Sequence, residues 1–357
     1  MKVGIFAITP AQIHFYKNII DQLEGEGHEV FILARDYGDT LELLEEMKIP
    51  YHLFSRPPAS KAGKVLGFPK ELLDAFLALH RWGADIVTGF GMYEAFISAV
   101  LRIPCVAFTD SEYSVNSKSY VIQFKLASPF LDAVVTPKKY KDNLGFKHIK
   151  VNSYKELAYL HQRYYVPNKD IYGMLGIPEF DEYVLLRFNA FDAVHDYGIT
   201  GFGENDKIEL TSVLSKYAHV FISSEMVLPH DLDKYQLHVQ KNRIHDVLYY
   251  AKLLVTDTQT MTTEAALLGT PAVRCNAFVG IHDMSNFEEL EHDYGLIYNF
   301  RDPQEAINKA DELMKMNDLK ERWAEKRQMM LSEKEDVCSA FVNILDETYL
   351  NSKKFRG

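Results

Sequence analysis

The sequence predicts an α/β protein built from two doubly wound parallel sheets in two domains. The chain has 357 residues, more than a single hydrophobic core usually serves. Short apolar runs alternate with stretches of helical periodicity along its length. The alternation starts again after about residue 166, so the architecture repeats although the sequence does not.

The first half begins with a strand at 3–8, whose continuous apolar run is typical of a central parallel strand. Apolar residues then recur at helical spacing until Gly27 ends the helix. No GxGxxG follows the first strand, which argues against a dinucleotide site. Residues 55–69, rich in Pro, Gly, Ser and Lys, are predicted to form a surface loop. The other strands are expected at 29–34, 51–53, 85–88, 104–108 and 133–136, and the other helices at 40–47, 70–82, 93–101 and 117–126.

The second half follows a hinge region at 150–167 and repeats the alternation. Its strands are expected at 183–188, 219–223, 253–256, 271–273 and 295–299, and its helices at 206–215, 245–251, 262–268 and 303–316. A charged helical stretch at 319–350 ends the pattern.

The stretch 253–274, LLVTDTQTMTTEAALLGTPAVR, contains the tightest strand–helix–strand connection in the chain. Thr260 or Thr262 is the expected cap of its helix, and Gly269 ends it. A helix that starts just past a parallel strand directs free N–H groups and a positive dipole end above the sheet. Anionic ligands bind there in open α/β folds, although an ordinary strand–helix–strand unit fits the spacing equally well.

Several motifs in this stretch resemble the nucleotide-binding segment of GT-B enzymes, which include nucleotide-sugar glycosyltransferases and UDP-N-acetylglucosamine 2-epimerases. These motifs are Thr256-Asp257-Thr258, Met261, Glu264-Ala265-Ala266 and Leu268-Gly269-Thr270-Pro271. Nearly the whole chain also resembles the domain of unknown function family 354, through Pro10…His14-Phe15, Gly27-His28, Arg187-Phe188, His245-Asp246 and Thr260-Met261.

The resemblance implies a GT-B fold with two Rossmann-like domains facing a cleft. Residues 1–165 would bind the acceptor, residues 166–334 the nucleotide sugar, and the helix at 335–357 would cross back to the first domain. The helix start at Thr258, Thr260, Met261 and Thr262 would hold the diphosphate, and Glu264 the ribose. The implied donor is a UDP-linked sugar, with no cofactor, and the acceptor is a lipid-linked or polysaccharide precursor of carbohydrate biosynthesis.

Two other functions stay open. A nucleotide-sugar 2-epimerase is the second hypothesis, and a non-catalytic nucleotide-sugar-binding relative is the third. The epimerases' Ser-Gly-Gly turn is replaced by Thr258-Gln259-Thr260, whose backbone has less freedom to approach phosphate. Their Gly-Asp-Thr, Glu-Ala-Gly-Leu-Arg and Glu-Arg-Pro-Glu patterns are also missing, which favours the transferase.

Three residues of the first half are candidates for acid/base catalysis. His14 follows a central strand, where an imidazole could serve as a general base, or it could simply be a solvated residue at a helix start. Asp110 and Glu112 follow another strand end and could act as a base or hold a sugar hydroxyl. Their alternative role is to cap the next helix.

Four cationic or imidazole side chains of the second half are candidates for phosphate binding. Arg187 and His195 follow the strand at 183–188, and Arg187 could bind phosphate bidentately or form a salt bridge. Arg243 and His245 precede the nucleotide strand, where GT-B enzymes face the base and phosphates; His245 could instead cap its helix.

Composition limits the remaining possibilities. The formal charge of −11 makes nucleic acid an improbable partner. The three cysteines are far apart, and no acidic or His/Cys constellation has ligand spacing, so neither a disulfide framework nor a metal site is expected. No signal peptide or run of 18 apolar residues occurs, so we expect a cytoplasmic protein, with peripheral membrane contact left open. The sequence allows a homodimer but does not determine the oligomeric state.

Overall fold

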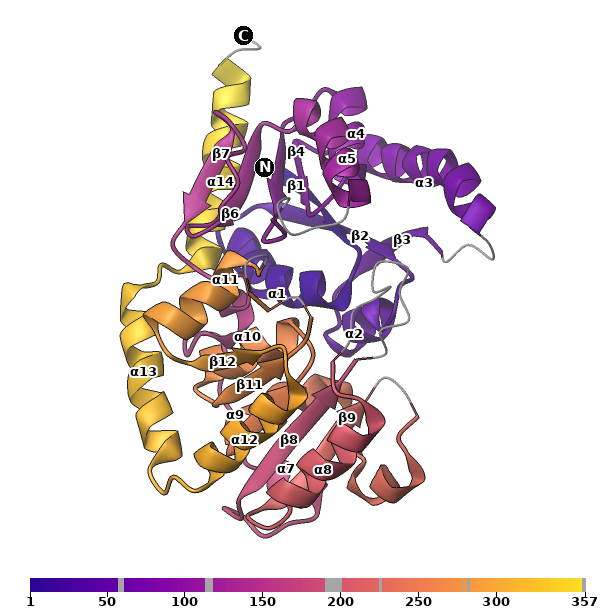
Figure 1. Ribbon diagram of the computed structural model, residues 1–357. Coiled ribbons are helices and arrows are strands. Elements are labelled where there is room, and N and C mark those ends of the chain that lie inside the picture. Colours follow the sequence, from indigo (N-terminus) through magenta and orange to yellow (C-terminus); the bar gives the residue numbers. More distant parts are fainter. Residues whose placement is uncertain are drawn as a thin grey trace. The chain divides into compact units, whose positions relative to one another are not determined.

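The structure is a computed structural model that describes residues 1–56, 61–112, 118–189, 201–224, 227–277, 279–280 and 283–354 (Figure 1). It divides into two compact units. Unit 1 comprises Met1–Tyr159 with Glu335–Gly357, and unit 2 comprises Leu160–Lys334. Each unit contains one parallel sheet with helices in the connections, which confirms the predicted fold class.

Unit 1 has a seven-stranded parallel sheet in the order β3-β2-β1-β4-β5-β6-β7. The chain reverses its direction across the sheet between β1 and β4, the kind of position where open α/β sheets bind ligands. The strands are β1 (Lys2–Ala7), β2 (Glu29–Arg35), β3 (Tyr51–Ser55), β4 (Ile86–Gly89), β5 (Cys105–Phe108), β6 (Ala133–Pro137) and β7 (His148–Val151). The helices are α1 (Pro10–Gly25), α2 (Thr40–Glu46), α3 (Lys61–Trp82), α4 (Tyr93–Leu101), α5 (Lys118–Ala127), the 3₁₀ turn η1 (Ser128–Phe130) and α14 (Val337–Lys354), with α6 (Leu157–Leu160) at the boundary.

The C-terminal helix α14 packs on unit 1, as predicted. Its Phe341 is fully buried and lies 5.5 Å from the Phe15 ring, 6.2 Å from Tyr16 and 6.2 Å from Phe108, measured between centroids. These rings come from α1, β5 and α14, so the end of the chain completes the core formed by its beginning.

Two predicted connections are wrong. The expected loop at 55–69 is helical from Lys61, and Pro69 lies inside α3. Phe68 packs 5.1 Å from the Tyr93 ring, and Glu71 accepts hydrogen bonds from Ser55 and Tyr93, so contacts with β3 and α4 override the weak local propensity. The expected helix at 319–350 is two helices, because the chain leaves unit 2 at Lys334 and enters unit 1 at Glu335.

Unit 2 has a five-stranded parallel sheet in the order β12-β11-β10-β8-β9. Its reversal lies between β8 and β10. The strands are β8 (Tyr183–Phe188), β9 (His219–Ser224), β10 (Leu253–Thr256), β11 (Ala272–Cys275) and β12 (Ile297–Phe300). The helices are α7 (Ile171–Leu175), α8 (Glu204–Leu214), α9 (Ile244–Tyr250), α10 (Thr260–Leu268), α11 (Ser285–Glu288), α12 (Pro303–Met314) and α13 (Leu319–Glu333), with short turns η2 (His230–Tyr235), η3 (Lys241–Arg243) and η4 (Glu289–Asp293).

All three cysteines are buried and unbridged, as their positions in apolar runs suggest. Among the described residues, no helix has both the length and the apolar character needed to cross a membrane.

Candidate functional site

The connection from β10 to α10 lies at the reversal point of the unit 2 sheet. Thr256 ends β10 and pairs with Arg187 on β8 and Arg274 on β11. The Thr256 hydroxyl accepts the Thr258 N–H at 2.9 Å, and the Thr262 hydroxyl donates to the Thr258 carbonyl at 2.6 Å. These two bonds fix the turn that leads into the helix.

Helix α10 begins at Thr260, and neither predicted threonine caps it. The N-cap residue is Gln259, which makes no side-chain capping bond. Thr260 is already helical, and the Thr262 hydroxyl serves as a donor rather than as the acceptor that a cap requires. The prediction failed because the turn is closed by hydrogen bonds among the threonines. The first turn of this nine-residue helix contains no acidic side chain, so its positive end faces the carboxyl end of the sheet.

Glu264 lies one turn into α10 and pairs with His245 on α9. The Glu264 Oε1 and His245 Nε2 atoms are 3.1 Å apart, and each residue is 7% exposed. The Tyr165 ring lies 6.3 Å from the imidazole in an edge-on arrangement. Sequence reasoning suggested Arg274 or Arg243 as an ion-pair partner of Glu264, but the structure gives this role to His245.

Asp246 organises the entry to α9. Its carboxylate accepts hydrogen bonds from the Tyr165 hydroxyl at 2.6 Å, the Asn168 N–H at 3.0 Å and Arg243 Nε at 2.6 Å. Arg243 is therefore held beside the start of α9, with its Nη2 atom buried and without a partner among the described residues. Burial and the bond to Asp246 raise the pKa of Tyr165, so its hydroxyl stays protonated and donates.

Arg187 and Asp257 meet at the ends of β8 and β10. Arg187 Nη1 donates to the Ser223 hydroxyl at 2.9 Å, and its carbonyl accepts the Asp257 N–H at 3.3 Å. Asp257 Oδ1 accepts the Asn189 N–H at 2.7 Å, whereas Oδ2 is buried and has no partner in the described part of the chain. Burial raises the pKa of Asp257 to about 7, against the Asn189 bond and the charge of Lys207. The predicted His195 lies outside the described residues.

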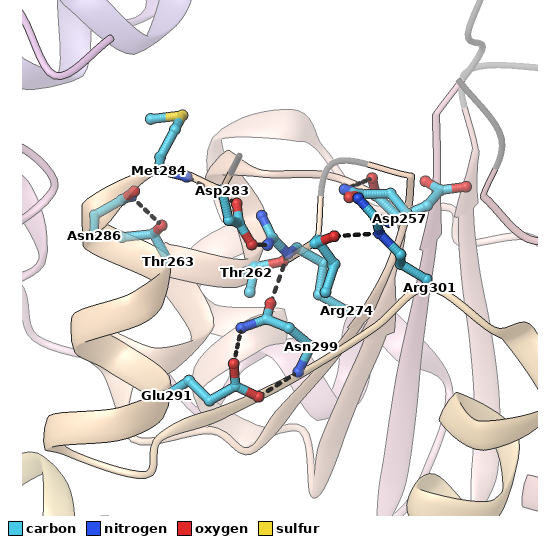
Figure 2. A network of polar contacts seen from close by, with 12 residues as sticks. Asp257, Thr262, Thr263, Arg274, Asp283, Met284, Asn286, Glu291, Asn299 and Arg301 are labelled. Carbon is cyan, nitrogen blue, oxygen red and sulfur yellow. Dashed lines mark hydrogen bonds and ion pairs between the residues drawn. The ribbon is translucent and has the colours of Figure 1, made fainter. Parts of the chain in front are cut away.

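Arg274 forms a second polar cluster beside this turn, shown in Figure 2. Its side chain is fully buried, donates to Asp283 and, through Nε at 2.7 Å, to Asn299, and lies 3.6 Å from the Phe287 ring centroid. Asn299 is fixed in turn by Glu291 at 2.8 Å. Sequence reasoning did not identify Arg274 as a site residue, although an arginine inside a buried apolar strand was an available signal.

Buried polar atoms without a partner concentrate around α10. Among the described residues of unit 2 there are four: Arg243 Nη2, Asp257 Oδ2, Arg274 Nη1 and Asn286 Oδ1. Asn286 donates to Thr263 of α10 at 3.4 Å, and the other three flank the helix through α9, β10 and β11. Unsatisfied buried groups are rare in folded proteins, and such a concentration is typical of a functional site.

The candidates of unit 1 are held by neighbouring side chains. Asp110 pairs with Lys155, and buried Glu112 accepts the Lys141 N–H at 2.6 Å. Burial disfavours the charge of Lys155, but Asp110 and Glu156 outweigh it and raise the lysine pKa.

His14 is half-buried on α1, with its ring 5.1 Å from Tyr159. Because Asp110 binds Lys155 and His14 packs on Tyr159, both candidates contact one short segment, 155–159.

Glu94 is a buried acid that sequence reasoning missed. It lies at the start of α4, fully buried, with Oε1 accepting the Gly91 N–H at 2.5 Å and Oε2 without a partner in the described ranges. Burial raises its pKa to about 7. Its carboxylate packs against Gly89 so closely that a Cβ there would lie 2.5 Å from it.

One group of potential metal ligands occurs among the described residues: Glu26, His28 and Asp346, whose ligand atoms lie within 4.8 Å of one another. The terminal ammonium of Met1 lies 3.0 Å from His28 Nδ1, and Nε2 lies 3.4 Å from Asp346. If Nδ1 accepts from the ammonium, Nε2 carries the proton and donates to Asp346, which accounts for the group without an ion. The absence of a metal therefore stays a prediction.

Two parallel α/β units, with the last helix returning to the first unit, define the GT-B fold class. The chain belongs to the family DUF354, described as proteins of unknown function, which matches residues 1–348. An uncharacterized protein of Methanocaldococcus jannaschii is 20% identical over 294 residues, 77% of this chain and 82% of that protein.

Solved structures share the fold at low sequence identity. UDP-GlcNAc 2-epimerase from Neisseria meningitidis, bound to UDP-GlcNAc, is 13% identical with a TM-score of 0.67, covering 98% of this chain and 100% of that chain. A Streptomyces sp. SF2575 glycosyltransferase complexed with thymidine diphosphate is 13% identical with a TM-score of 0.60, covering 97% and 99%.

Proposed function

We propose that the chain is a glycosyltransferase that binds a nucleotide-diphosphate sugar in unit 2. The observation that carries the proposal is the amino end of α10, which has no side-chain cap and lies at the reversal point of the sheet. Free N–H groups and the helix dipole there suit a diphosphate. The two similar structures bound to UDP-GlcNAc and thymidine diphosphate support a ligand of this class.

In this mechanism the N–H groups of Thr260, Met261 and Thr262 stabilise the diphosphate as it leaves the sugar. Glu264, oriented by His245, accepts hydrogen bonds from the ribose hydroxyls. Arg243, Arg187 and His195 are proposed to supply positive charge near the phosphates. In unit 1, His14, Asp110 or Glu112 would remove the proton from an acceptor hydroxyl.

The test measures UDP affinity by calorimetry, with GDP, CMP and dTDP for comparison. We expect Glu264→Gln to weaken binding about tenfold or more, because charge-assisted bonds contribute about 1.5–3 kcal/mol each. Glu289→Gln is the matched control: Glu289 is also 7% exposed and paired, with Lys334 at 2.7 Å, so its change should lower stability but preserve affinity. Equal UDP affinity of folded wild-type and Glu264→Gln protein would reject the ribose role.

A 2-epimerase is the second candidate, because the TM-score to the Neisseria epimerase, 0.67, exceeds that to the glycosyltransferase, 0.60. Incubation with UDP-N-acetylglucosamine alone separates the two. A transferase without its acceptor should release little UDP. Rapid UDP release together with a 2-epimerised sugar would assign the chain to the epimerases.

The proposed transfer does not require a protein-bound metal. We expect EDTA to leave activity largely intact, since helix N–H groups and arginine side chains stabilise the leaving group. Complete loss of activity with EDTA, restored by manganese, would refute this part of the proposal.

A further inference from the structure

Unit 1 exposes an apolar stripe along α5 and η1. Ile122 is 58% exposed, Leu126 58% and Phe130 43%, and these residues follow one another at intervals of four. Four-residue spacing places side chains on one side of a helix, the arrangement that normally faces a core. Here the core contacts come from Ala127 and Leu131, each 1% exposed, so the stripe is a second apolar face turned outward.

Neighbouring elements extend the stripe. The Phe96 ring of α4 lies 5.8 Å from Phe130, and the same helix carries Val100, 64% exposed. Lys147 Nζ donates to the Pro129 carbonyl at 3.2 Å, which brings the adjacent Phe146, 95% exposed, to the end of the stripe. We name Ile122, Lys125, Leu126, Phe130, Phe146 and Lys147 the α5 surface; α4 and α5 can be located in Figure 1.

The α5 surface lies in the basic part of an acidic chain. Residues 118–150 contain seven lysines, two aspartates and no arginine or glutamate, a formal charge of +5, whereas the whole chain carries −11. One of the two aspartates, Asp132, accepts the Cys105 N–H at 2.8 Å within the fold. Lys125 is exposed between Ile122 and Leu126 on the helix itself.

We propose that unit 1 docks through the α5 surface on an anionic lipid membrane. Lysines next to exposed apolar side chains suit a surface where phosphate headgroups border acyl chains. A stable protein partner usually buries about 800 Å² per side, which a narrow row of side chains does not provide. A few apolar side chains inserted among headgroups need no such area, because the lysines add electrostatic attraction. This inference does not depend on the proposed function.

The test is co-sedimentation of the full chain with vesicles of phosphatidylcholine alone or mixed two to one with phosphatidylglycerol. Wild-type protein should pellet with the anionic vesicles, and less so as salt is raised. Lys125→Ala with Lys147→Ala should lower the partition coefficient about thirtyfold, since each lysine contributes about fivefold. Changing Ile122, Leu126 and Phe130 to Ser should lower it more than tenfold.

Two control variants lie outside the α5 surface. Leu73→Ser changes a residue that is 56% exposed on α3, and Lys216→Ala removes an exposed lysine of unit 2; both should bind vesicles like wild type. Failure of wild-type protein to pellet with anionic vesicles would overturn the proposal, as would equal binding by the Ser variant. A wild-type dimer that the Ser variant converts to monomer, without vesicle binding, would assign the surface to a second copy instead.

Discussion

Asp257 combines burial with a broken hydrogen-bond pattern, and this has a measurable consequence for stability. Its pKa rises from 3.8 to about 7 on folding, so the folded protein binds the proton more tightly than the unfolded chain. Stability from this group is present below about pH 4 and is lost as the pH rises through about 7.

Asp257→Asn should therefore stabilise the protein above about pH 7 but not near pH 4. Asparagine keeps an oxygen for the Asn189 N–H and removes the buried charge. A shift of this size corresponds to at most about 4 kcal/mol. Urea titrations of both proteins at about pH 5 and pH 8 measure the difference. Asp311→Asn is the control, because Lys315 lowers the pKa of exposed Asp311; a pH-independent effect of Asp257→Asn would contradict the argument.

At the residue level, chemistry could be predicted from the sequence but hydrogen-bond partners could not. Glu264 was predicted on α10, yet its partner His245 is 19 residues away. Asp110 and Lys155 are 45 residues apart, and Glu112 and Lys141 are 29 apart. Such pairs depend on how strands and helices are placed in the fold, which local periodicity does not describe.

Among the elements, α10 depends on its last turn as much as on its first. Gly269 ends the helix with φ of +78°, and a Cβ there would lie 2.9 Å from Arg327 Cδ. Arg327 Nε donates to the Leu267 carbonyl at 2.6 Å, so its displacement would also disturb the helix end.

Gly269→Ala should cost about 1–2 kcal/mol of unfolding free energy because L-residues resist the left-handed conformation. Gly25→Ala is the matched control: Gly25 ends α1 and lacks a left-handed φ, and a Cβ added there would meet no atom of the described residues within 4 Å. That change should be neutral or stabilising by up to about 1 kcal/mol. Urea denaturation of both variants tests the pair, and equal effects would show that backbone conformation is not the cause.

Elements with a strong period were predictable, whereas their connections were not. The bounds predicted for β8, β10 and α4 agree with the structure, since continuous apolar runs and a helical stripe define them. The start of α3 was missed because Phe68 and Glu71 hold it against other elements. The break between α13 and α14 was missed because two charged helices in succession give no periodic signal at the point where the chain changes units.

Across the whole molecule, the chain leaves unit 1, builds unit 2 and returns through α14. Glu335 N–H donates to the Asn152 carbonyl at 2.9 Å, and the Ser153 hydroxyl donates to the Glu335 carbonyl at 2.9 Å. Removing apolar contacts from α14 should therefore destabilise unit 1, although the change lies near the C-terminus.

Phe341→Ala tests this dependence. Phe341 is fully buried among the rings of Phe15, Tyr16 and Phe108, so truncation should cost unit 1 about 3–5 kcal/mol. Leu350→Ala is the control on the same helix, because Leu350 is 56% exposed and should change stability little.

The two tryptophans allow each unit to be followed separately, since Trp82 lies in unit 1 and Trp323 in unit 2. In a Trp323→Phe background, fluorescence reports unit 1, and Phe341→Ala should lower its urea midpoint clearly. In a Trp82→Phe background, fluorescence reports unit 2, whose midpoint should move much less if the units unfold as separate cooperative blocks. Equal shifts in both backgrounds would show that the units unfold together, and that α14 stabilises the molecule as a whole rather than unit 1 alone.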